Sequence, residues 1–246
     1  MNEQSALAGF TDKWRARWPE WRVAEVFVPA PQRAIAVAWF ALRQELADAA
    51  WSGADPRPGE AKLGWWVEEL HGWSQGRRRH PLGAVLQSRA VPWSLLATCV
   101  PALLVARERA ADVDEAIEAL EPYAEGIAGT AATLFGGNSP APARSTVIGL
   151  LAEQLQVLGE SAVPLQVLAQ ANAAGATGSN DAAMRAWARE LLQRWPPPHA
   201  GARPGRIHAA LLRERLHRFA GGNASSPTQA LSRWTALWTA WCAARS

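Results

Sequence analysis

The stretch PQRAIAVAWFALRQELADAAWSGADPRPGEAKLGWWVEELHGWSQGRRRHPLGAVL, from Pro31 to Leu86, decides the fold. In its first part apolar residues recur at helical spacing, and the Pro/Gly-rich loop SGADPRPGE then ends the helix. A second helical pattern, Ala61–Ser74, carries an inner apolar stripe. We therefore expect a helical hairpin in which Trp65 and Trp66 lie on a helix antiparallel to residues 33–50, with at least one indole buried.

Helical periodicity also governs the chain outside the hairpin. Near the N-terminus Trp14, Trp18 and Trp21 fall on one face, which we expect to cap the helical bundle. No β-alternation of useful length and no fixed repeat period is present. The chain is therefore expected to be all-α, with about ten helices in a single domain that spans residues 1–246.

The middle of the chain shows where helices should bend or approach one another. We expect a buried helix near residues 93–107, followed by a long helix that Pro122 kinks or divides. Gly126 and Gly129 follow at a spacing of three, so a neighbouring helix should come close there.

Composition describes a globular chain without selecting a partner. The 246 residues are 49% hydrophobic and 19% charged, enough to bury a substantial core. The formal net charge is +3, almost all of the basic residues are arginine, and the pI is near 9.4. Nucleic acid, anionic membrane and diphosphate partners all suit this charge, but it is too small to select one.

Several function classes lack the residues they need. The sequence contains no nucleophile elbow, P-loop, dinucleotide-binding glycine motif or metalloprotease motif. Cys99 and Cys242 are far apart and have no metal-ligand spacing, so a reducing cytoplasm is the default location. The N-terminus does not read as a signal peptide. The tryptophans fall mostly on apolar stripes, which explains them by core packing, so no nucleic-acid partner is expected.

Four segments carry a resemblance to a known family. The motif KLGWWVEEL at Lys62–Leu70, after an arginine-led helix and a charged loop, and HPLGAVL at His80–Leu86 resemble the squalene/phytoene synthase family. The resemblance extends through YAEGIAG at residues 123–129 and GLLAEQLQVL at residues 149–158. It implies the all-α isoprenoid synthase fold. In active members it also implies head-to-head joining of two prenyl diphosphates, with Mg²⁺ held by two aspartate-rich helical motifs.

The expected aspartates are replaced here. Aligned without gaps from the arginine at position 43, the first motif falls on Leu46, Ala47 and Ala50, which cannot bind a metal. Glu45 and Asp48, at i and i+3, could hold a weaker ion or could form a solvated or arginine-paired helix face. At the second motif Val157 stands at an expected aspartate position. We therefore expect no metal ligands, no catalytic residues and, at best, millimolar Mg²⁺ binding.

The positive groups of the family pattern are better kept than the negative ones. Guanidinium groups pair with phosphate oxygens, and the run at residues 77–79 either binds an anionic head group or is simply solvated. His80 matches the family's His-Pro position, which suits the start of a helix better than catalysis. The candidate ligand-binding residues are Arg33, Trp39, Arg43, Glu45, Asp48 and Trp66.

Two functions are compatible with this pattern. The first is a catalytically degenerate relative, without a cofactor, that binds an apolar or isoprenoid ligand or acts on a protein partner. For the partner role, QELAD at residues 44–48 resembles the variant in a branch of respiratory complex I assembly factors. The second is an active Mg²⁺-dependent prenyltransferase that makes squalene or phytoene. Either protein would be cytoplasmic, and it could contact the inner face of the membrane peripherally.

The C-terminal stretch LSRWTALWTAWCAARS, residues 231–246, predicts a tryptophan-lined helix face. Trp234, Trp238 and Trp241 lie close to one line on a helix, with arginines near both ends. Such a face either packs on the bundle or lies in a membrane interface. Packing on the bundle is the expectation that the sequence favours.

Overall fold

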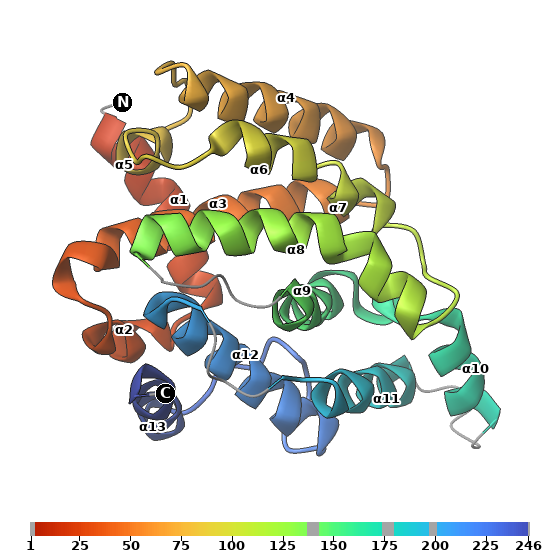
Figure 1. Ribbon diagram of the computed structural model, residues 1–246. Coiled ribbons are helices and arrows are strands. Elements are labelled where there is room, and N and C mark those ends of the chain that lie inside the picture. The colour runs from red at the N-terminus through yellow and green to blue at the C-terminus, as the bar shows by residue number, and fades with distance from the viewer. Residues whose placement is uncertain (1–2, 137–142, 174–179, 197–200, 246) are drawn as a thin grey trace.

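Helices form all the regular structure in the computed structural model, which describes residues 3–136, 143–173, 180–196 and 201–245 (Figure 1). Ten of these helices are seven residues or longer, as expected, and the described residues contain no strand. In chain order the elements are α1 (Glu3–Arg17), α2 (Trp21–Ala24), the 3₁₀ turn η1 (Glu25–Phe27), α3 (Ala30–Trp51), α4 (Arg57–Ser74), α5 (Gly83–Leu86), α6 (Trp93–Cys99), α7 (Ala102–Val105), α8 (Val113–Phe135), α9 (Ala143–Leu158), the 3₁₀ turn η2 (Gly159–Ala162), α10 (Leu165–Ala173), α11 (Asn180–Gln193), α12 (Arg203–Ala220) and α13 (Arg233–Arg245).

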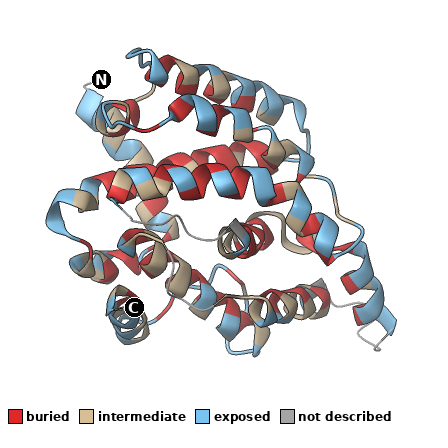
Figure 2. Ribbon diagram, viewed as in Figure 1, coloured by how far each residue is buried: buried red, intermediate tan, exposed pale blue. Residues whose placement is uncertain are grey.

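Helix α3 is the centre of the structure. Most of its residues are buried, and it packs against α1, α4, α5, α7 and α9 (Figure 2). Alanines at many of its positions let neighbouring helices come close. At Gly59 of α4 a Cβ atom would lie 2.2 Å from the carbonyl oxygen of Ala49, so only glycine fits this contact.

The predicted hairpin is confirmed as α3 followed by α4. Trp66 is fully buried, whereas Trp65 is only partly buried. The Trp66 ring packs edge-on against Trp65 and Trp73, and its centroid lies 4.5 Å from the ring of His80. These aromatic contacts join side chains of α4 to one another and to the loop that follows it.

A second group of helices packs across α8 and α9. Helix α8 packs on α6, α7 and α9, and α9 in turn contacts α11 and α12 (Figure 1). Helix α13 closes this side by packing on α12 and α2. The buried apolar residues from both groups belong to one contiguous cluster, and the single-domain assignment stays a prediction.

The N-terminal segment is tied into the core as expected. Trp14, Trp18 and Trp21 are all buried. Between them and α12, the buried Arg215 donates to Glu20 through Nε at 2.8 Å and Nη2 at 2.5 Å. Because both side chains are 1% exposed, loss of either one would leave a buried charge without its partner.

Three expectations for the middle of the chain need correction or refinement. The helix expected over residues 93–107 is two helices, α6 and α7, separated at Pro101. Pro122 lies inside α8 and does not divide it, and the ribbon of α8 is bent along its length (Figure 1). The close approach holds at Gly126, where a Cβ would lie 2.9 Å from Sγ of Cys99. It was wrong at Gly129, which is exposed and has open space beside it.

The expected packing face of α13 was also wrong. Trp234, Trp238 and Trp241 point outward and are 81%, 65% and 36% exposed, whereas the residues buried against the bundle are Ala236, Ala240 and Ala243. Small side chains let α13 lie close to its neighbours, so packing selects the alanine face. Among the described residues, no helix has the length and apolar character needed to cross a membrane.

Trp66→Ala tests the hairpin core. Removing this fully buried ring should lower the free energy of unfolding by about 3 to 5 kcal/mol, because a cavity replaces the aromatic contacts. Trp234→Ala is the matched control: that indole is exposed, so the change should stay within about 0.5 kcal/mol. Urea denaturation measures both, and equal losses in the two variants would contradict the assignment.

Candidate functional site

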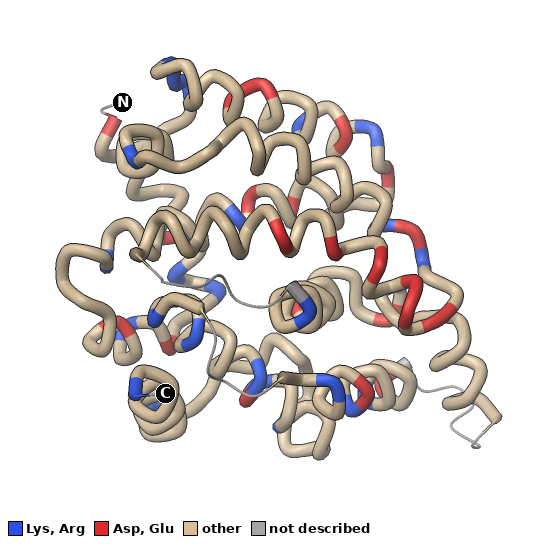
Figure 3. The backbone as a smooth tube through the Cα atoms, in the orientation of Figure 1, with Lys and Arg blue, Asp and Glu red and all other residues tan. Residues whose placement is uncertain are grey.

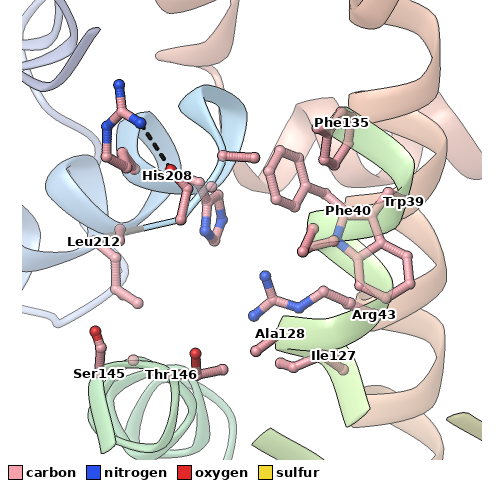
Figure 4. A pocket seen from close by; sticks show the side chains of 18 of the residues that line it. Trp39, Phe40, Arg43, Ile127, Ala128, Phe135, Ser145, Thr146, His208 and Leu212 are labelled. Carbon is pink, nitrogen blue, oxygen red and sulfur yellow. Dashed lines mark hydrogen bonds between the residues drawn. The ribbon is translucent and has the colours of Figure 1, made fainter. Parts of the chain in front are cut away.

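A cavity of about 120 Å³ lies between the two helix groups (Figure 4). Helices α3, α8, α9 and α12 form its walls, together with residues just before α12. Most of the described lining is apolar. Its charged side chains are Arg43 and Glu153, which pair with each other, and Arg206, which donates to the carbonyl oxygens of Gly201 and Ala243. The principal lining residues are Trp39, Phe40, Arg43, Ile127, Ala128, Phe135, Thr146, Gly149, Glu153, Arg206, His208 and Leu212.

Small residues create the space. Gly149 on α9 and Gly205 near the start of α12 line the cavity, and a Cβ at either one would meet no atom within 4 Å. On the opposite walls, Trp39 and Phe40 of α3 and Ile127 of α8 supply apolar surface. The glycines thus leave room that the facing aromatic side chains do not fill.

The charged part of the cavity is an ion pair between α3 and α9. Nη2 of Arg43 donates to both carboxylate oxygens of Glu153, at 3.0 and 3.1 Å. The two side chains are only 16% and 18% exposed. Figure 4 shows the Arg43 guanidinium reaching from α3 into the cavity towards His208. The pair joins residues that are 110 positions apart in the sequence. Arg43 thereby neutralises the charge of Glu153, the only carboxylate among the described lining residues.

His208 of α12 completes this polar group. Its ring stacks on Phe40 with centroids 4.7 Å apart, and its Nδ1 lies 3.8 Å from Oε1 of Glu153. Burial, followed by the positive charges of Arg43 and Arg215, lowers the pKa of His208 well below 6.5, so the ring is neutral at pH 7. Within the described part of the chain, Nε2 of His208 and Nε of Arg43 are buried without a hydrogen-bond partner.

Of the six residues singled out in the sequence, only Trp39 and Arg43 line the cavity. Glu45 lies about 200° around the α3 axis from Arg43, at about 100° per residue. There it accepts from Lys13 of α1 at 2.6 Å and Lys62 of α4 at 2.8 Å. Asp48 pairs with Lys13 at 2.9 Å and with Arg17 at 3.1 Å.

These contacts fix the charge state of Glu45. Burial acts to raise its pKa, but the hydrogen bonds from Lys13 and Lys62 outweigh burial and lower the pKa. For Lys13, burial acts to lower the pKa, and the bonds to Glu45 and Asp48 outweigh it and raise the pKa. Glu45 is therefore ionised, and cations hold both Glu45 and Asp48 on the side of α3 that faces away from the cavity.

The other two sequence candidates also lie outside the cavity lining. Arg33 donates to the carbonyl oxygens of Val28 and Val26, at 3.0 and 3.2 Å, and so holds the turn before α3. Trp66 is a core residue of the hairpin. Their positions therefore assign structural roles to both.

The arginine run at residues 77–79 is engaged elsewhere. Glu69 of α4, which is 1% exposed, accepts from the backbone N–H groups of Arg79 and His80 and from Nε of Arg79. His80 is enclosed by aromatic rings, and burial lowers its pKa to about 4. Neither Arg79 nor His80 lines the cavity. Their hydrogen bonds to Glu69 anchor the loop to α4.

The residues present do not fit Mg²⁺. The ion needs near-octahedral oxygen coordination, and carboxylates supply the charge in protein sites. In the described parts of the chain no group of three or more His, Cys, Asp or Glu side chains is placed to hold a metal. Glu153, which supplies the one carboxylate among the described lining residues, already binds Arg43.

Sequence reasoning missed most of the lining. Glu153 lies 110 residues from its partner Arg43, so their contact leaves no local pattern in the sequence. The sequence around His208 has no ligand pattern, because His208 is a single buried ring among aromatic residues from α1 and α3. Gly149 gave no signal that one sequence could carry.

Comparison with known protein families finds a match to part of the chain. The squalene/phytoene synthase family model matches residues 23–137, which include α3, α4 and α8. The matched segment supplies the α3 and α8 walls of the cavity, whereas the α9 and α12 walls lie beyond it. No curated protein matches the chain.

The Arg43–Glu153 pair can be tested by a double-mutant cycle. Arg43→Met leaves a largely buried carboxylate without its partner, so it should lower the free energy of unfolding by about 1 to 3 kcal/mol. Adding Glu153→Leu removes the orphaned charge and should restore at least half of that loss. Chemical denaturation measures all variants. Simple additivity of the two single losses would show that the side chains do not interact.

The buried histidine predicts a pH dependence. In the unfolded chain His208 takes up a proton near pH 6.5, whereas in the folded state its lowered pKa keeps it neutral. The unfolded state then binds more protons, so the free energy of unfolding falls as the pH drops from 7 to 5. His208→Gln should flatten this slope, with the remainder coming partly from His80, whose folded pKa is also lowered.

His217→Gln is the control, because that histidine is exposed on the same helix. Urea titrations at pH 7, 6 and 5 provide the measurement. A slope that is the same in wild type and His208→Gln would refute the role given to His208.

Proposed function

The chain belongs to the squalene/phytoene synthase family, and we propose that it is a non-catalytic member that binds an apolar, isoprenoid-type ligand between α3, α8, α9 and α12. The proposal concerns the ligand and the loss of catalysis. The chemistry of the side chains around the cavity supports both parts of the proposal, which go beyond the family match.

The observation that carries the proposal is the Arg43–Glu153 ion pair. Ionisation of a prenyl diphosphate requires clustered positive charge on the leaving group, which metal ions held by several carboxylates supply. Here α3 offers a guanidinium to the cavity, and α9 offers one carboxylate that this guanidinium already binds. The pair is internally neutral, and a carboxylate beside the guanidinium disfavours a diphosphate.

The cavity side of α3 supports the same conclusion. The resemblance placed the first metal motif at Leu46, Ala47 and Ala50, which offer no oxygen ligand. Ala47 lines a smaller pocket next to the main cavity, so this position points towards the site but carries only a methyl group. The acidic residues of α3 are turned away from the cavity and neutralised by lysine and arginine.

The size of the cavity limits what fits without movement. An engineered cavity of about 150 Å³ admits benzene, and this one is about 120 Å³. It therefore holds a group of about one isoprene unit as it stands, and a longer chain must extend beyond it. An uncharged polar head suits the buried Nε2 of His208, which has no partner among the described residues.

Two other roles stay predictions. An active Mg²⁺-dependent prenyltransferase would need metal ligands other than Glu45 and Asp48, whose carboxylates are held by Lys13, Lys62 and Arg17. The assembly-factor role rests on the QELAD segment, in which Glu45 is buried between α1 and α4. The ion pairs of Glu45 inside the protein explain why a glutamate stands at this position. Because Glu45 is buried, it does not offer a contact to a protein partner.

Gly149→Leu tests ligand binding at the cavity. The substitution should keep the fold, because leucine favours helices and the position faces open space, but it should fill the cavity. We expect geraniol and farnesol to bind the wild type, as measured by tryptophan fluorescence, and to bind this variant about ten-fold more weakly or worse. Farnesyl diphosphate should bind more weakly than farnesol.

Gly129→Leu is the matched control. It makes the same change inside α8 at an exposed glycine outside the cavity, so alcohol binding should be unchanged. Incubation of the wild type with farnesyl or geranylgeranyl diphosphate and Mg²⁺ should release no diphosphate. Turnover in that assay would establish the enzyme instead, and equal binding by both leucine variants would move the ligand away from this cavity.

A further inference from the structure

We propose that the outer face of α13, with the groove beside it, docks the protein on an anionic membrane surface. This inference is independent of the ligand in the central cavity. It rests on three observations: exposed tryptophans in one line, arginines placed around them, and a charge asymmetry along the chain.

The exposed tryptophans form one stripe. Trp234, Trp238 and Trp241 lie at i, i+4 and i+7, which places them within about 60° of one another around the helix axis. Trp238 and Trp241 contact each other with ring centroids 5.0 Å apart. The stripe runs for about 10 Å along α13, while the opposite alanine face holds the helix on the bundle.

Arginines lie beside this stripe. The guanidinium of Arg245 lies 4.6 Å from the ring of Trp241. Trp238 forms one side of an open groove of about 770 Å³, whose other sides are built by α11 and α12. That groove is lined by Arg189, Arg206 and Arg213, with Glu214 as the one acidic residue among its described lining.

The charge asymmetry extends beyond the groove. Residues 181–246 hold ten arginines against Asp181, Glu190 and Glu214, a net charge of +7. Because the whole chain is +3, residues 1–180 carry −4. Figure 3 shows the same division in space, with acidic positions mostly on the earlier helices and few on α11 to α13. A charge separation of this kind orients a protein towards a negative surface.

A membrane fits this face better than a second protein does. Fully exposed tryptophans offer 150 to 250 Å² each, so the stripe exposes on the order of 400 Å². A stable protein interface buries about 800 Å² on each partner. Indoles favour the headgroup region of a bilayer, and each arginine near an anionic surface adds further attraction.

Vesicle sedimentation tests the proposal with the full-length protein. We expect binding to vesicles of phosphatidylcholine with phosphatidylglycerol, weak binding to phosphatidylcholine alone, and loss of binding at high salt. Replacing all three stripe tryptophans by alanine should weaken binding about ten-fold or more, without changing thermal stability, because these rings are exposed. The matched control removes three exposed apolar side chains elsewhere, in the variant Leu95→Ala, Val105→Ala, Leu165→Ala, and should bind like the wild type.

A second pair of variants tests the charges. Arg213→Gln with Arg245→Gln should weaken binding about five-fold for each arginine. Arg77→Gln with Arg89→Gln removes the same charge from exposed positions outside the groove and should have a much smaller effect. If both pairs of substitutions weakened binding equally, the net charge of the protein alone would explain the attraction. The assignment of this face would then be wrong.

Other outcomes would also overturn the proposal. One is the absence of binding to anionic vesicles at low salt, and another is unchanged binding by the triple tryptophan variant. A dimer in light scattering that this variant abolishes, without vesicle binding, would assign the face to a second copy of the chain. Displacement of the protein from vesicles by a single-stranded oligonucleotide, with oligonucleotide binding lost in the same variant, would assign it to nucleic acid.

Discussion

Burial of α3 on nearly all sides is the constraint on which the rest of the structure depends. A charged side chain on a buried helix must be paired, because an unpaired ion is costly to take out of water. Arg43, Glu45 and Asp48 lie within two turns of this helix but point in different directions. Their partners therefore come from three different helices, α9, α1 and α4, and the pairs hold these helices around α3.

The packing of apolar helix faces decides how much of the fold could be predicted from the sequence. The hairpin and the N-terminal tryptophans were predictable, because their apolar stripes repeat at helical spacing and become core. The orientation of α13 was not, because its tryptophans also have helical spacing while its alanines allow the closest packing. An apolar stripe indicates which residues share a face, and the size of the side chains on the opposite face decides which face packs.

The cavity was less predictable than the fold for a physical reason. Its volume comes from missing side chains at Gly149 and Gly205, and its polar group joins residues from three helices. Trp39 and Arg43 were identified because they lie on α3, the helix whose apolar spacing is clearest in the sequence. Phe40 and His208 were not, since a ring stacked on another ring across the core leaves no mark in the local sequence.

The cavity and the α13 groove adjoin each other, because Ser145, Arg206 and Ala209 line both. This adjacency matters for an apolar ligand, since each CH₂ group exposed to water costs about 0.8 kcal/mol and a farnesyl chain would cost on the order of 10 kcal/mol. A ligand that left a bilayer through open water would have to overcome that cost. If α13 lies on the membrane, the groove faces the lipid and the cavity lies directly behind the groove. An apolar ligand could then pass from the bilayer through the groove into the cavity without exposing its chain to water. The exposed tryptophans and the small cavity would serve the same transfer.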